Sequence, residues 1–212
     1  MAWVETERQA LVQTLRTADP GAPTLCEGWD VRHVLAHLVQ REHSPASSIG
    51  DLVVRRKPGD EKYLGQLVST ALSPLGYEAL VKRFEAGPGR WNPMRWAGES
   101  INLLEYVVHH EDVRRGSGSA APRELPPAEA DAVWAKLPTM VRLSYRTCPV
   151  GVTLSRPGGQ SQVVKTGQGS VVLTGEPVEL ALYVTGRRSA ARVQVSGSPT
   201  DVETFEGWAS RR

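Results

Sequence analysis

The spacing of apolar and polar residues is helical from the N-terminus to about residue 148. Apolar side chains that recur every three or four residues line one stripe of a helix, and such a stripe is normally buried. Stripes bounded by proline, glycine and capping residues predict four principal helices over about residues 3–18, 31–42, 96–115 and 127–143, with weaker helical segments near 63–72 and 77–85. Four principal helices favour a four-helix bundle.

The pattern changes once, close to Cys148. Beyond this point, short runs rich in valine, threonine and leucine are separated by glycine-containing turns, which is typical of strands in a small sheet. The expected strands cover residues 150–155, 162–166, 170–174 and 192–196, and the expected helices cover 176–184 and 201–209. The sequence therefore predicts an α+β fold in two domains, a helical bundle over residues 1–148 and a small α+β domain over residues 149–212.

The composition is that of an ordinary globular protein. The chain has 212 residues, of which 40% are hydrophobic and 23% charged, and 25 basic residues nearly balance 23 acidic ones. This balance offers no basic surface for nucleic acid, and no apolar run approaches the length of a membrane span. The N-terminal residues include acidic side chains where a secretory signal needs a basic segment followed by an apolar one. We therefore expect a cytoplasmic protein.

The histidines are the most informative residues, because all of them lie on or just after two of the predicted helices. They are His33, His37, His43, His109 and His110. Glu105 and His109 border the apolar arc of the helix over 96–115, and residues four apart are neighbours on a helix. A carboxylate at the border of a core is costly to desolvate without a partner, and a metal ion is one such partner.

The best third ligand is His37, which borders the apolar stripe of the other helix. A set of two histidines and one glutamate suits zinc or another borderline divalent cation, and it leaves one position open for water or substrate. His33 and His37 are also four residues apart and form an alternative pair, although His33 lies nearer the expected solvent face. We expect His43 and His110 to lie at the surface.

The remaining candidates have two interpretations each. Arg187, Arg188 and Arg192 suit an anionic ligand, but arginines on a small sheet are more often only solvated. Cys26 and Cys148 form no Cys-x-x-Cys motif, so a thiolate zinc site is not indicated, while one long-range disulfide stays possible. Cys26 is equally explained as a small apolar residue of the core. Neither the His-Glu-x-x-His motif of zinc proteases nor the paired Glu-x-x-His motifs of di-iron bundles occurs.

Two segments resemble motifs of the DinB-like, mycothiol-dependent maleylpyruvate isomerase N-terminal superfamily. Residues 25–38, LCEGWDVRHVLAHL, resemble its Trp-x-Val-Arg-Asp-Leu-x-x-His-Leu motif, and residues 105–114, EYVVHHEDVR, resemble its Glu-x-x-x-His-x-x-Asp-x-Arg motif. Members often carry a small sterol-carrier-like α+β domain after the bundle, so the resemblance extends over the whole chain. It is closest to an actinobacterial branch whose members are described as metal-binding proteins.

The resemblance implies a metal site at His37, Glu105 and His109, the residues that their helical positions also favour. The superfamily motif has an acidic residue where this chain has His33, which adds an imidazole near the site. The thiol that the resemblance implies is mycothiol. The resemblance assigns no catalytic residue beyond the water or thiolate bound to the metal. It also assigns no residue that binds the thiol.

Together these features favour a divalent-metal-binding protein, with zinc as the expected metal, that acts as a mycothiol-dependent transferase or isomerase. The metal would hold the thiol as a thiolate and direct it at an electrophilic small molecule. Two alternatives stay open, a hydrolase that uses metal-activated water and a non-catalytic metal- or ligand-binding module. The expected partners are a small-molecule substrate and a low-molecular-weight thiol, without nucleic acid or membrane, in a monomer or homodimer.

Overall fold

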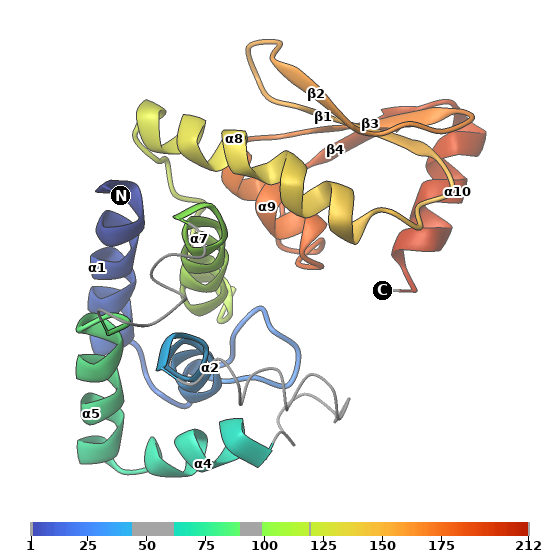
Figure 1. Ribbon diagram of the computed structural model, residues 1–212. Helices are drawn as coiled ribbons and strands as arrows, with labels where there is room; N and C mark the ends of the chain where they lie inside the picture. Colours follow the sequence, from blue (N-terminus) through green and yellow to red (C-terminus); the bar gives the residue numbers. More distant parts are fainter. Residues whose placement is uncertain (1, 44–61, 90–98, 119, 212) are drawn as a thin grey trace. The chain divides into compact units, whose positions relative to one another are not determined.

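The computed structural model describes residues 2–43, 62–89, 99–118 and 120–211 (Figure 1). The chain forms two compact units, Met1–Arg123 and Glu124–Arg212, which are considered separately below. Both contain helices, and the sheet lies in the second unit, so the expected α+β class is confirmed. No helix in the described ranges is both long enough and apolar enough to span a membrane.

The first unit is a bundle of helices around one apolar core. Its described helices are α1 (Ala2–Thr17), α2 (Val31–His43), α4 (Lys62–Thr70), α5 (Pro74–Glu85) and α7 (Glu99–Arg115). Helix α1 packs against α5 and α7, and α2 packs against the same two helices and against α4. Helices α1, α5, α2 and α7 thus enclose the core, to which buried side chains from each contribute, among them Leu11, Leu15, Val34, Leu38, Phe84 and Tyr106.

The membership of this bundle differs from the sequence prediction in one helix. The helix expected over 127–143 forms as α8 (Pro127–Ser144), but it belongs to the second unit, and α5 occupies the fourth position in the bundle. The division between the units accordingly falls after Arg123, ahead of α8, rather than after the expected residue 148. The expected start of α7 near residue 96 lies outside the described residues.

Helix α5 is short, but its ends and its buried face are well defined. Ser73 caps its N-terminus, because the Ser73 hydroxyl accepts a hydrogen bond from the backbone N–H of Gly76. Proline occupies the first helical turn, where its missing N–H costs nothing. Four side chains of this helix are buried: Tyr77, Leu80, Val81 and Phe84. Burial of this face explains why a segment with a weak sequence pattern completes the bundle.

The second unit is a four-stranded mixed sheet with three helices. Its strands lie in the order β2-β1-β3-β4, where β1 and β3 are parallel and the two outer pairs are antiparallel. The strands are β1 (Gly151–Ser155), β2 (Ser161–Lys165), β3 (Ser170–Thr174) and β4 (Gln194–Gly197), and the helices besides α8 are α9 (Pro177–Val184) and α10 (Pro199–Ala209). Each agrees with its predicted range to within about two residues, the ordinary uncertainty of element ends.

Candidate metal centre

His37, Glu105 and His109 come together inside the first unit. His37 lies on α2, and Glu105 and His109 lie one turn apart on α7. Each offers one ligand atom, and these three atoms all lie within 4.8 Å of one another. The imidazole rings of His37 and His109 have their centroids 5.0 Å apart, and His109 Nε2 lies 3.5 Å from Glu105 Oε2. The structure therefore brings together the three residues that the sequence singled out.

The donor set and its surroundings fit a divalent cation. Two imidazoles and one carboxylate are common zinc ligands. His109 Nδ1 donates a hydrogen bond to Asp112 Oδ2 over 2.8 Å, which leaves Nε2 on the side of Glu105. Histidine ligands in proteins are usually held in this way, with the second nitrogen bonded to a carboxylate or carbonyl. The Asp112 side chain is completely buried, so solvent does not compete for this bond.

The electrostatics of Glu105 and His109 are coupled. Burial alone would raise the pKa of Glu105, but the hydrogen bond and charge of His109, with smaller contributions from His37 and Arg41, lower it below the usual range. Burial alone would lower the pKa of His109, yet its hydrogen bonds with Asp112, Cys26 and Glu105 raise it well above its ordinary value. Positive charge is thus stabilised between Glu105 and Asp112, which is the condition that a cation site requires.

Arg41 adds a positive charge next to these residues. It follows His37 by one helical turn on α2, and its Nε lies 3.7 Å from Glu105 Oε1. Its Nη1 donates to Asn102 Oδ1 over 2.8 Å, so the guanidinium is held from α7 as well. Arg41 was not among the residues predicted from the sequence to belong to the site. The available signal was its four-residue spacing from His37, but an arginine near the end of a helix is usually only solvated.

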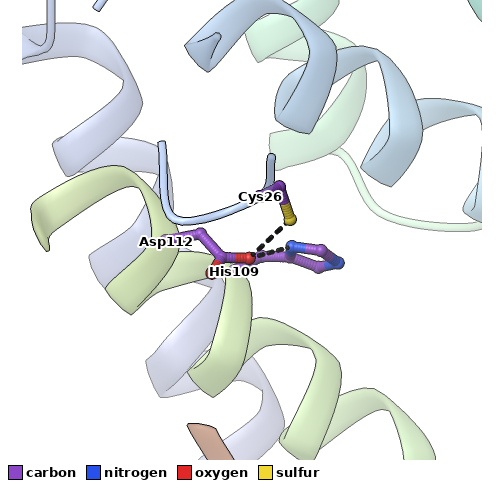
Figure 2. Close-up of side chains that lie close together, drawn as sticks. All are labelled: Cys26, His109 and Asp112. Carbon is purple, nitrogen blue, oxygen red and sulfur yellow. Dashed lines mark hydrogen bonds and ion pairs between the residues drawn. The ribbon is translucent and has the colours of Figure 1, made fainter. Parts of the chain in front are cut away.

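The loop between α1 and α2 brings Cys26 to the same side chains. The Cys26 thiol donates to Asp112 Oδ2 over 3.2 Å, and Figure 2 shows this oxygen between the sulfur and the His109 ring. The loop is fixed to α7 because the Leu25 N–H donates to the backbone oxygen of Asp112 over 3.2 Å. A Cβ on Gly116 would lie 2.1 Å from the Pro23 carbonyl oxygen, so the close approach of loop and helix requires glycine there.

Trp29 and His33 flank His37 on the α2 side. The Trp29 ring lies 5.4 Å from the His37 ring and 6.3 Å from the His33 ring, measured between centroids. His33 Nδ1 lies 2.7 Å from Asp30 Oδ1 at the start of α2, and the same carboxylate caps the helix by accepting the His33 backbone N–H. Among the described residues, the ligand atoms that converge with those of Glu105 and His109 include an atom of His37 and none of His33. Its imidazole instead supports the N-terminus of α2 beside the Trp29 ring.

The prediction for His110 was wrong. Its side chain is buried, and its two ring nitrogens lie 2.8 Å from Glu7 Oε1 and 2.7 Å from Thr14 Oγ1. Glu7 also accepts two hydrogen bonds from the guanidinium of Arg123. His110 therefore belongs to a polar network between α1 and α7. His43, the other histidine expected at the surface, is partly exposed, and its Nε2 bonds the carbonyl oxygen of Arg83.

The arginines of the second unit make local contacts. Arg187 donates to the backbone oxygen of the residue that caps the C-terminus of α9, and Arg188 donates to the backbone oxygen of Ala209 in α10. The backbone N–H of Arg192 donates to the buried carboxylate of Glu179 over 2.7 Å. The guanidinium groups of Arg187 and Arg188 therefore bond backbone oxygens of the second unit, whereas the bond at Arg192 involves its backbone alone.

The two cysteines do not form the disulfide that the sequence left possible. Cys26 is partly exposed in the first unit, and Cys148 is buried in the second. The interpretation of Cys26 as a simple apolar core residue also changes, because its sulfur bonds a buried carboxylate.

A comparison with known protein families supports the first of the two motifs, at residues 25–38. Residues 4–91 match the family model described as "Mycothiol maleylpyruvate isomerase N-terminal domain". The resemblance to this family is confirmed. The matched residues include His37 and end before Glu105, so the second half of the candidate centre is supported by its geometry. No curated protein matches the chain.

Two solved structures share the fold. Both are crystal structures of the mycothiol-dependent maleylpyruvate isomerase, one of them a histidine-to-alanine mutant. Each aligns with 92% of this chain and 90% of its own chain at a TM-score of 0.57, with 15% identity for the mutant and 16% for the other structure. At this level of identity, the likeness shows that the chain has the fold of the isomerase across both units.

Proposed function

We propose that this chain is a divalent-metal-dependent enzyme that uses a low-molecular-weight thiol, mycothiol, to isomerise or S-conjugate an electrophilic small molecule. The observation that carries the proposal is the convergence of His37, Glu105 and His109 within 4.8 Å of one another, beside a completely buried Asp112. The family match and the shared fold supply the thiol, because both point to a mycothiol-dependent isomerase.

The charges of the site favour an anionic ligand. Glu105 carries the only negative charge among the three ligands, so the set neutralises one of the two charges of a divalent cation. Bound zinc would supply the positive charge that keeps a thiol in its reactive thiolate form near neutral pH. Asp112 holds His109 in the tautomer that presents Nε2 to Glu105. Arg41, 3.7 Å from Glu105, adds a second positive charge that favours an anionic substrate.

The first prediction concerns metal content. We expect protein purified without a metal-affinity tag to contain about one equivalent of zinc per chain, as an open three-ligand site requires, and His109→Ala to contain almost none. Glu105→Gln keeps the shape of the side chain and should also lose the metal. Because this variant is nearly isosteric, its loss of metal would not be explained by misfolding, as that of the alanine variant could be. His33→Ala is the matched control, because it removes a neighbouring imidazole that lies outside the set. Elemental analysis of the wild type and the three variants measures their zinc content. Zinc retained by Glu105→Gln would contradict the assignment of Glu105 as a metal ligand.

The second prediction concerns turnover. We expect isomerisation of maleylpyruvate, or conjugation of a related electrophile, only when mycothiol and zinc are both present. The change in the ultraviolet absorbance of the substrate measures the reaction. Glu105→Gln should lower kcat/KM by about a hundredfold or more, because its loss removes a ligand and not merely an outer contact. Hydrolysis of esters or amides without thiol would favour the hydrolase instead. Zinc and thiol binding without turnover of any electrophile would favour a binding module.

A further inference from the structure

A second group of ligand atoms shares His109 with the proposed centre. Cys26 Sγ, Asp112 Oδ2 and His109 Nδ1 all lie within 4.8 Å of one another (Figure 2). The sulfur lies 3.2 Å and the imidazole nitrogen 2.8 Å from the shared carboxylate oxygen. In a tetrahedral zinc site with bonds of about 2.0–2.3 Å, ligand atoms are separated by about 3.3–3.7 Å. The two distances to Asp112 Oδ2 are therefore a few tenths of an ångström shorter than those between the ligands of such a site, and the sulfur and the imidazole nitrogen lie within 4.8 Å of each other.

We propose that Cys26, Asp112 and His109 form a second metal-binding set that is selective for thiophilic divalent cations such as Cd²⁺. The selectivity follows from the thiolate, because soft sulfur ligands prefer soft cations. The proton of the Cys26 thiol leaves to solvent when the sulfur binds the cation.

The charge of this set suits its burial. A thiolate and a carboxylate together carry two negative charges, which neutralise a divalent cation completely. The side chain of Asp112 is fully buried and that of His109 is 8% exposed, so a neutral complex avoids most of the cost of placing net charge away from water. The set of His37, Glu105 and His109 carries one negative charge less and would leave a net positive charge there.

The two sets compete for one imidazole. A neutral histidine has a lone pair on only one of its ring nitrogens. The first set uses Nε2 while Nδ1–H donates to Asp112, whereas the second set uses Nδ1 and requires the ring proton on Nε2. A cation at Cys26 and Asp112 therefore removes His109 from the first set, and the chain holds one ion at a time. Only this competition rests on the proposed function; the second set stands on its own three residues.

Cadmium titration of the full-length chain tests the proposal. We expect one equivalent of Cd²⁺ to bind with the ultraviolet charge-transfer absorption of a cadmium–thiolate bond. Cys26→Ser should abolish the absorption and weaken Cd²⁺ binding by at least about tenfold, the lower bound for loss of a contact that orients a ligand. Cys148→Ala is the matched control and should retain both. His37→Ala should also retain both, because His37 belongs to the first set alone.

The second metal-binding set and its competition with the first set for His109 can be refuted separately. Absence of the charge-transfer band in the unmodified chain, or a band that survives Cys26→Ser, would overturn the second set. Loss of the band in His37→Ala would also overturn it, because the thiol would then bind only alongside the first set. Zinc-loaded protein should release its zinc on addition of Cd²⁺, detected with a colorimetric chelator, and simultaneous retention of both ions would overturn the competition. A cadmium band in protein that never binds zinc would refute only the proposed function.

Discussion

At the scale of single residues, His109 is engaged at both of its ring nitrogens. Nδ1 donates to Asp112, and Nε2 lies on the side of Glu105. We expect Asp112→Asn to weaken zinc binding by about 10–100-fold, because the neutral amide holds the imidazole less firmly and makes it a weaker ligand. Competition with a chelator of known affinity measures the effect. Cys26→Ser, which leaves the Asp112 carboxylate in place, is the control, and equal zinc affinities for the two variants would contradict this role of Asp112.

The sequence identified the residues whose directions follow from helix geometry. Glu105 and His109 share a helix, so their four-residue spacing places them on one face, and the same reasoning selected His37. Cys26 lies in a loop without periodicity, and its position depends on bonds to α7 that are distant in sequence. The prediction that His110 lies at the surface was wrong because one apolar arc does not describe the whole buried face of α7, which packs against both α1 and α2.

At the scale of elements, a polar network joins α1 to α7. Glu7 accepts hydrogen bonds from Arg123 and from His110, and the guanidinium of Arg123 also contacts Glu111. We expect Glu7→Gln to lower the free energy of unfolding by about 3 kcal/mol at neutral pH, near the lower end for breaking a buried ion pair because Glu111 remains. Urea unfolding measures the change. Glu5→Gln, on the exposed face of α1, should change stability by no more than about 0.5 kcal/mol.

The same network gives stability a defined pH dependence. Burial alone would raise the pKa of Glu7, but the hydrogen bonds from His110 and Arg123 lower it below the ordinary value of 4.5. A carboxylate with a lowered pKa in the folded state stabilises fully above its unfolded value, and this contribution is lost as the pH falls through the folded value. The difference in stability between wild type and Glu7→Gln should therefore narrow below about pH 4.5. A difference that stays constant down to acid unfolding would contradict this account.

The positions of helices and strands in the sequence were predicted better than the elements against which they pack. The strands and α9 were located because glycine-containing turns bound short apolar runs, a local signal. The amphipathic stripe of α8 is buried as expected, at Val133, Leu137 and Val141. However, a stripe indicates that a face is covered and does not indicate which element covers it. For this reason α8 was assigned to the bundle, whereas its contacts are with α9 and β2.

At the scale of the whole molecule, every residue of both ligand sets lies in the unit Met1–Arg123. A ligand that binds only the folded state stabilises it by about 2.7 kcal/mol at a hundred times its dissociation constant. We expect zinc to slow hydrogen exchange in peptides from α2 and α7 of the full-length chain, and to leave peptides from β1, β3 and α9 unchanged. Mass spectrometry before and after chelation measures this difference, and His109→Ala should show no zinc-dependent change. Equal protection of strands in Glu124–Arg212 would mean that the second unit takes part in metal binding, contrary to a centre formed by the first unit alone.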